Sequence, residues 1–170
     1  MIGGNNPGIE CCCFSCCTCI NIGFLKTENG LLKIAEIILG SFCQFMAVNF
    51  GLSYVATMGV AYQGFVTTAV WCVMTTFLLS VCYLVSYKSA SLIRQSLFEL
   101  VFNTVAAFNY ISASSYLGFV VKTLLYPQYI ITPHFEVYPA MTTAYMIGTL
   151  VGIVHAYDAY KSYKYYKGYR

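Results

Sequence analysis

Four titratable residues lie inside or at the edge of long apolar segments, where ionised side chains are costly and rare. They are Glu36, Glu99, His155 and Asp158. The group has two chemical interpretations. It could relay protons or ions, or it could be a polar layer that fixes helix register, with the acids paired to His155, Lys33, Arg94 or tyrosine hydroxyls. The structural interpretation is favoured, because charged groups within membranes usually pair with one another.

The segments that carry these groups are predicted to be membrane-spanning helices. The chain has 170 residues, of which 59% are hydrophobic and 9% charged, whereas a soluble domain carries roughly 25% charge. No Asp, Glu, Lys or Arg occurs in the 51 residues from Ile37 to Tyr87. As one helix this run would reach about 76 Å, against a hydrocarbon core of about 30 Å. It must therefore cross twice, and the turn is expected at 53–64, where Gly59 and Gly64 loosen the chain.

The predicted fold class is an all-α, integral membrane four-helix bundle with both termini cytoplasmic. Its helices are expected at about 31–52, 65–87, 96–121 and 139–160, with a polar hinge at 88–95 and an outer loop at 122–138. The domain organisation is a cysteine-rich cytoplasmic segment (1–23), a four-helix transmembrane domain (24–164) and a basic, tyrosine-rich cytoplasmic tail (165–170).

The basic residues set the predicted orientation. Eight of the nine Lys and Arg residues fall on one side of such a bundle, and the other side has only Lys122. Positively charged flanks face the cytoplasm. The eight are Lys26, Lys33, Lys88, Arg94, Lys161, Lys164, Lys167 and Arg170. In this orientation the four titratable residues share one layer near the cytoplasmic side, away from the centre of the bilayer where a transporter usually binds its substrate.

Small residues recur every four positions along the last predicted helix. They are Ala140, Ala144, Gly148, Gly152 and Ala156. A spacing of four keeps side chains near one face, and small side chains allow another helix to approach closely. We expect this face to pack within the bundle; the alternative is self-association into a homo-oligomer.

Six cysteines precede the first helix in a dense run. They are Cys11, Cys12, Cys13, Cys16, Cys17 and Cys19. Clustered cysteines beside a membrane helix are candidates for S-palmitoylation, whereas a zinc site is disfavoured because no histidine lies nearby. The sequence contains no recognisable catalytic motif and no glycine-rich phosphate loop, so we expect no enzyme activity, no cofactor, no metal site and no nucleic-acid partner.

Three segments together resemble the MARVEL domain, the four-helix module of the myelin-and-lymphocyte protein, plasmolipin and the chemokine-like-factor transmembrane proteins. They are TENGLLKIAEIILGSF (27–42), FELVFNTVAAFNYISAS (98–114) and VGIVHAYDAYKSYK (151–164). The cysteine-rich segment is not part of that module. The chain is also similar to an arthropod member of the family linked to myoblast fusion.

The resemblance implies a non-enzymatic, multi-pass protein of the plasma membrane or vesicle membranes. Such a protein organises membrane at sites of vesicle trafficking, apposition or fusion, with lipid partners that include cholesterol-rich or sphingolipid-rich domains and with other membrane proteins. Two alternatives stay open. One is a channel or proton-coupled transporter that uses Glu36, Glu99, His155 and Asp158, and the other is a structural protein of cell junctions.

Overall fold

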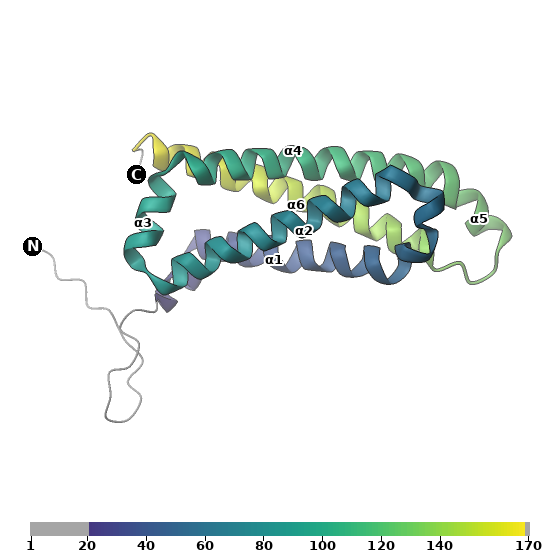
Figure 1. Cartoon of the computed structure of the whole chain (residues 1–170), viewed down its shortest axis with the longest axis horizontal. Helices are drawn as coiled ribbons and strands as arrows, with labels where there is room; N and C mark the ends of the chain where they lie inside the picture. Colours follow the sequence, from purple (N-terminus) through teal and green to yellow (C-terminus); the bar gives the residue numbers. More distant parts are fainter. Residues whose placement is uncertain (1–20, 169–170) are drawn as a thin grey trace, which may run out of the picture.

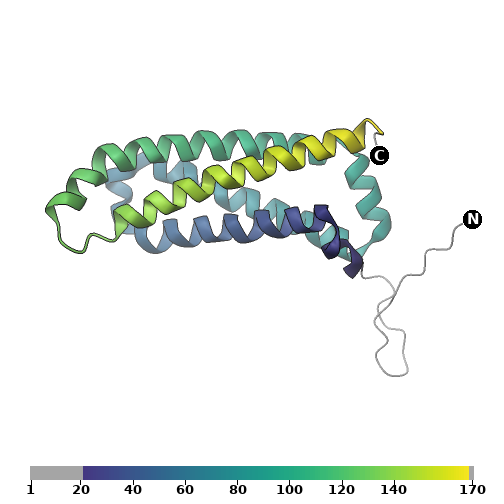
Figure 2. The ribbon, with the colours of Figure 1, turned by 180° about the vertical axis from the view of Figure 1, so that it is seen from behind.

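Four long helices lie side by side in the computed structural model, which describes residues 21–168 (Figure 1). They are α1 (Glu28–Met46), α2 (Val55–Val85), α4 (Leu97–Val120) and α6 (Val137–Tyr166). Helix α1 packs against α2 and α6, and α4 packs against the same two helices. The two ends of the described chain lie at the same end of this bundle (Figures 1 and 2).

Helix α1 begins where a short 3-10 helix, Ile22–Lys26, folds back against it. The Thr27 side chain caps α1, because its Oγ1 accepts a hydrogen bond from the Gly30 amide at 3.2 Å. A Cβ atom at Gly30 would lie 2.1 Å from the Phe24 carbonyl oxygen. Glycine is therefore required there by the close approach of two backbone segments.

The turn between α1 and α2 begins before the predicted 53–64 and overlaps it, because the non-helical residues Tyr54 and Gly59 lie inside that range. A π-helical turn, Ala47–Gly51, and a 3-10 turn, Leu52–Tyr54, reverse the chain, and α2 then begins at Val55. The predicted start of the second helix at 65 was too late, because α2 begins at Val55, although its first residues are separated from the rest by a break in helical geometry at Gly59. Its φ of 54° introduces a kink, a conformation that glycine adopts without steric cost.

The predicted polar hinge at 88–95 is a short helix, α3 (Tyr87–Gln95), that crosses the end of the bundle between α2 and α4 (Figure 1). Extended backbone at Ser86 (φ −147°, ψ 119°) and Ser96 (φ −83°, ψ 153°) separates α3 from its neighbours. The Arg94 guanidinium of α3 lies 5.1 Å from the centroid of the Tyr165 ring, so α3 is held against the end of α6.

The opposite end of the bundle holds a second short helix in place of part of the predicted loop at 122–138. Helix α4 continues through a π-helical turn, Val121–Leu125, into α5 (Tyr126–Ile131). The chain then turns at His134, whose φ is 63°, and α6 begins at Val137 and extends to Tyr166, past the predicted end at 160. The first two residues of the predicted tail are thus helical.

The outer surface of this bundle is far more apolar than that of a water-soluble protein. Charged side chains such as Lys33 and Glu99 are buried, while large apolar side chains such as Phe108 (72% exposed) and Phe119 (65% exposed) lie on the outside. Three helical stretches are long and apolar enough to cross a membrane: Glu28–Val85, Leu97–Ile131 and Val137–Tyr166. An apolar exterior of this extent requires a lipid environment.

Candidate functional site

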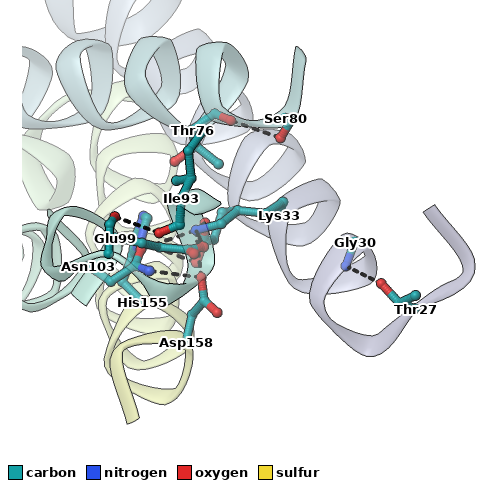
Figure 3. Close-up of polar contacts among 12 residues, drawn as sticks. Thr27, Gly30, Lys33, Thr76, Ser80, Ile93, Glu99, Asn103, His155 and Asp158 are labelled. Atoms are coloured by element: carbon teal, nitrogen blue, oxygen red, sulfur yellow. Dashed lines mark hydrogen bonds and ion pairs between the residues drawn. The ribbon is translucent and has the colours of Figure 1, made fainter. Parts of the chain in front are cut away.

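Six polar side chains from three helices meet inside the end of the bundle nearest the described termini. We call this group the buried ion cluster (Figure 3). None of the six is more than 1% exposed. The members are Lys33 and Glu36 of α1, Glu99 and Asn103 of α4, and His155 and Asp158 of α6.

Helix geometry explains why each helix contributes two members. Lys33 and Glu36 are three residues apart, as are His155 and Asp158, and Glu99 precedes Asn103 by four. Side chains three or four apart lie on the same face of an α-helix. Each helix therefore presents one polar pair to the interior, and the packing of α1, α4 and α6 brings the pairs together.

The ammonium group of Lys33 is the centre of the cluster. Its Nζ lies 2.5 Å from Asp158 Oδ2, 3.2 Å from Glu36 Oε2 and 3.5 Å from Glu99 Oε1. The same Nζ donates to Asn103 Oδ1 at 3.3 Å. One cation thus joins three carboxylates from three helices.

Asn103 links the other members. Its Nδ2 donates to Asp158 Oδ2 at 2.9 Å, and its Oδ1 lies 3.1 Å from His155 Nδ1. The sequence interpretation missed this residue because it considered only ionisable groups. A signal was available, since Asn103 lies one helical turn after Glu99, the only charged residue of α4.

The His155 imidazole packs against two aromatic rings, and its Nδ1 lies close to two side-chain oxygen atoms. The imidazole stacks on Tyr110 with centroids 5.8 Å apart and meets Phe102 edge-on at the same distance. Nδ1 lies 3.2 Å from Glu36 Oε1 and 3.1 Å from Asn103 Oδ1. Because Asn103 Nδ2 donates to Asp158, Asn103 Oδ1 is an acceptor, and a proton on Nδ1 of His155 satisfies this contact.

The composition of the cluster limits its chemistry. It contains three carboxyl groups and one ammonium group, so full ionisation of the acids would leave two negative charges in a buried site. Such a site can hold helices in register or hold protons. Within residues 21–168 no group of His, Cys, Asp and Glu side chains is arranged to bind a metal ion.

The predicted small-residue face of α6 is only partly buried. Ala140, Ala144, Gly148 and Gly152 face the interior, but Ala156 is exposed. At about 100° per residue, each step of four advances the position by about 40°. The series has rotated by about 160° when it reaches Ala156, and the buried stripe continues through His155, Asp158 and Ala159 instead.

Close packing depends on the two glycines of this face. A Cβ atom at Gly148 would lie 2.6 Å from both Phe65 Cε2 and Ser114 Oγ, and one at Gly152 would lie 2.8 Å from Ile111 Cγ1. The predicted role of these residues in packing within the bundle thus has a direct geometric basis. The cysteines proposed for acylation, Cys11 to Cys19, lie outside the described residues.

A groove of about 400 Å³ lies between α1 and α6, beside the buried ion cluster. Its floor and walls are formed by Leu31, Leu32, Ala35 and Tyr157. Glu28 and Lys161, which form an ion pair, also line the groove. Leu31 and Tyr157 are 57% and 50% exposed, so the groove opens onto the lipid-facing side of the bundle.

An apolar exterior and a buried ion cluster define the chain as a helical membrane protein. The chain is 44% identical to Protein singles bar of Drosophila melanogaster over 155 residues, which make up 91% of this chain and 88% of that protein. It therefore belongs to the family of Protein singles bar. No family model matches the chain, and no solved structure matches it.

Proposed function

We propose that this chain is a non-enzymatic, MARVEL-type membrane organiser that acts in vesicle trafficking, membrane apposition or membrane fusion, including fusion of myoblasts. Two findings support the proposal. The chain shares a family with Protein singles bar, and its segments at 27–42, 98–114 and 151–164 resemble a MARVEL domain. The structural observation that carries it is the buried ion cluster, in which Lys33 ties three helices together inside an apolar exterior.

In the proposed arrangement the chain crosses the membrane four times, with both termini in the cytoplasm. The basic side chains of Lys26, Arg94 and Lys164 belong to elements at the end where the described termini lie, whereas Lys122 belongs to the other end. This distribution supports the orientation, because positively charged flanks are retained in the cytoplasm. An epitope at the carboxyl terminus should be reached by antibody only after permeabilisation; labelling of intact cells would refute the orientation.

The groove between α1 and α6 is the proposed lipid contact. An apolar recess that is also lined by an ion pair suits a lipid that has one polar end and a rigid apolar body, such as a sterol. A photoactivatable sterol should label this protein in membranes, and Ala35→Phe should block labelling by filling the recess. Ala156→Phe, at an exposed position of α6, is the matched control and should label normally.

S-acylation of the cysteine run is part of the proposal. Several acyl chains would bind the amino-terminal segment to the inner leaflet, since each buried methylene contributes roughly 0.8 kcal/mol. Replacement of Cys11, Cys12, Cys13, Cys16, Cys17 and Cys19 by serine should abolish hydroxylamine-sensitive acyl labelling. Labelling that persists would exclude these residues as the acylated sites.

The cellular test is myoblast fusion in tissue that expresses this chain. Removal of the protein should lower the number of nuclei per muscle fibre, and re-expression of the wild-type chain should restore it. Unchanged fibres after complete removal would refute a role in this fusion. Localisation of the tagged chain between vesicles and plasma membrane would then separate trafficking from cell-junction roles.

The excess of carboxyl groups in the buried ion cluster favours one second candidate, a proton pathway. Purified protein in sealed vesicles decides between the two functions. A proton flux that disappears in Glu99→Gln would establish a transporter, and the absence of any flux above protein-free vesicles supports an organiser. Because Lys33 already occupies the space between the acids, we expect no flux.

A further inference from the structure

One exposed face of α6 changes its side-chain chemistry in the same order as the layers of a bilayer. Seven exposed residues on this face are spaced alternately four and three positions apart. Such spacing keeps side chains within one narrow arc of an α-helix. We call these residues the α6 stripe: Met146, Leu150, Ile153, Tyr157, Tyr160, Lys164 and Lys167.

The order of residue types indicates the depth of the α6 stripe in the membrane. The three aliphatic residues come first, then the two tyrosines, and the two lysines follow at the end of the bundle where the described termini lie (Figure 1). Aliphatic side chains suit the acyl chains, tyrosines concentrate at the boundary with the headgroups, and lysines extend into the headgroup zone. The stripe follows α6, which is long and apolar enough to cross the membrane. Lys164 and Lys167 are therefore expected at the level of the lipid phosphates.

Ring contacts hold both ammonium groups on the membrane side of their own backbone positions. Lys164 Nζ lies 4.7 Å from the centroid of the Tyr160 ring, and Lys167 Nζ lies 4.9 Å from that of the Tyr163 ring. Each ring precedes its lysine by four residues, which is about 6 Å along a helix. Cation–π attraction to the ring face restrains a long side chain that is otherwise free to move. The two cations are thus directed toward the bilayer from consecutive turns of one helix.

Neither of these ammonium groups has an acidic partner in the part of the chain that the structure describes. Lys161, three residues before Lys164, also lies over a tyrosine ring, but it forms an ion pair with Glu28. Among residues 21–168, no carboxylate lies within ion-pair distance of Lys164 or Lys167. Their two positive charges are therefore available to an anion outside this part of the protein.

From these contacts we infer that Lys164 and Lys167 bind the headgroup of an anionic phospholipid, such as phosphatidylserine, in the protein's own membrane. A phospholipid that lies along the aliphatic part of the α6 stripe places its phosphate beside the two lysines. A headgroup with net negative charge is favoured over zwitterionic phosphatidylcholine, because two unpaired cations attract the uncompensated charge. The stripe shares only Tyr157 with the proposed sterol groove. The inference adds a lipid class to the proposed function, and it rests on the orientation given there only for assignment to the inner leaflet.

The decisive measurement places one tryptophan beside the two lysines. Trp71 is the only native tryptophan, so the full chain carries Trp71→Phe and Tyr160→Trp, which keeps an aromatic face beneath Lys164. The protein is reconstituted in phosphatidylcholine vesicles that contain phosphatidylserine, and the acyl chains of one lipid or the other carry bromine. Fluorescence quenching at equal mole fractions of brominated lipid gives the relative affinity of the two lipids for this site. Phosphatidylserine should be preferred by about thirtyfold, since each basic residue near an anionic surface contributes roughly fivefold.

Two double variants that lose the same charge test whether the preference belongs to the α6 stripe. Lys164→Gln with Lys167→Gln should lower the affinity ratio to roughly one, because both cations of the stripe are removed. Lys26→Gln with Lys122→Gln removes two exposed lysines from opposite ends of the bundle and should keep most of the preference. All four positions are exposed, so the helical circular dichroism of both variants should match that of the wild type.

Three results would overturn the inference. They are equal affinity for the two lipids when the lysines are intact, equal loss of preference in the two double variants, and relief of quenching by millimolar inorganic phosphate, which would assign the lysines to a soluble anion. The vesicle assay is independent of the cellular test. If the lipid preference is absent while myoblast fusion still requires the protein, the inference fails and the proposed function stands. If the preference is present while fusion does not require the protein, the reverse holds.

Discussion

Replacement of Lys33 by methionine tests the organisation of the buried ion cluster most directly. Methionine keeps most of the side-chain length and removes the only ammonium group among three carboxylates. At an effective dielectric constant of about 20, a single ion pair at 3.2 Å is worth about 5 kcal/mol before desolvation. Desolvation offsets part of this attraction, and removal of one partner of a buried pair costs about 3–5 kcal/mol. We expect Lys33→Met to lower the unfolding free energy by that amount.

The measurement is unfolding of the purified protein in mixed micelles, followed by loss of helical circular dichroism as denaturing detergent is added. Lys164→Met removes an exposed charge near the end of α6 and should unfold as wild type does. Asp158→Asn added to Lys33→Met should recover part of the lost stability, because it removes a carboxylate that the first change leaves unpaired. If Lys33→Met is as stable as Lys164→Met, the ion pairs of Lys33 do not stabilise the bundle.

Three further predictions use the same assay. Gly30→Ala should destabilise the protein by about 1–3 kcal/mol, because its Cβ would overlap a backbone carbonyl of the preceding turn, whereas Gly23→Ala, with no contact closer than 3.6 Å, should be tolerated. Asn103→Leu should cost about 1–3 kcal/mol by leaving buried partners unpaired, while Asn49→Leu, at an exposed site, should have little effect. Glu28→Gln should leave the unfolding midpoint unchanged, since the Glu28 carboxylate that pairs with Lys161 is 82% exposed; a large loss would contradict the distinction between surface and interior pairs.

The residues of the buried ion cluster were largely predictable because depth in a membrane follows from position along a helix. Glu36, Glu99, His155 and Asp158 each lie near the same end of an apolar segment, so an antiparallel arrangement brings them to one level. The sequence alone does not determine how each helix is rotated about its own axis. The sequence interpretation named Lys33 among the possible partners of the acids and among the flanking charges of the cytoplasmic side, but it could not show that Lys33 is 1% exposed and inside the bundle.

The turns were harder to predict because the local signals were ambiguous. A glycine in an apolar run can end a helix or bend it, and only the backbone angle at Gly59 decides between the two. Helix α3 has no long apolar run, and α5 is only six residues long. Pro127 was a usable signal for a helix start, but the second proline at 133 made an irregular loop look equally reasonable.

The distribution of charge among the helices explains why an apolar protein retains acids in its interior. Helix α1 contributes one positive charge, Lys33, and one carboxylate, Glu36, so its charges in the cluster cancel. Helices α4 and α6 contribute the carboxylates of Glu99 and Asp158 and no positive charge. The ammonium group of Lys33 lies 3.5 Å and 2.5 Å from those two acids, so each is compensated when its helix packs against α1. Uniform apolar helices would pack in several registers with similar energy, because lipid tails and side chains are equally apolar. A single shared cation removes that ambiguity and fixes α1, α4 and α6 in one register.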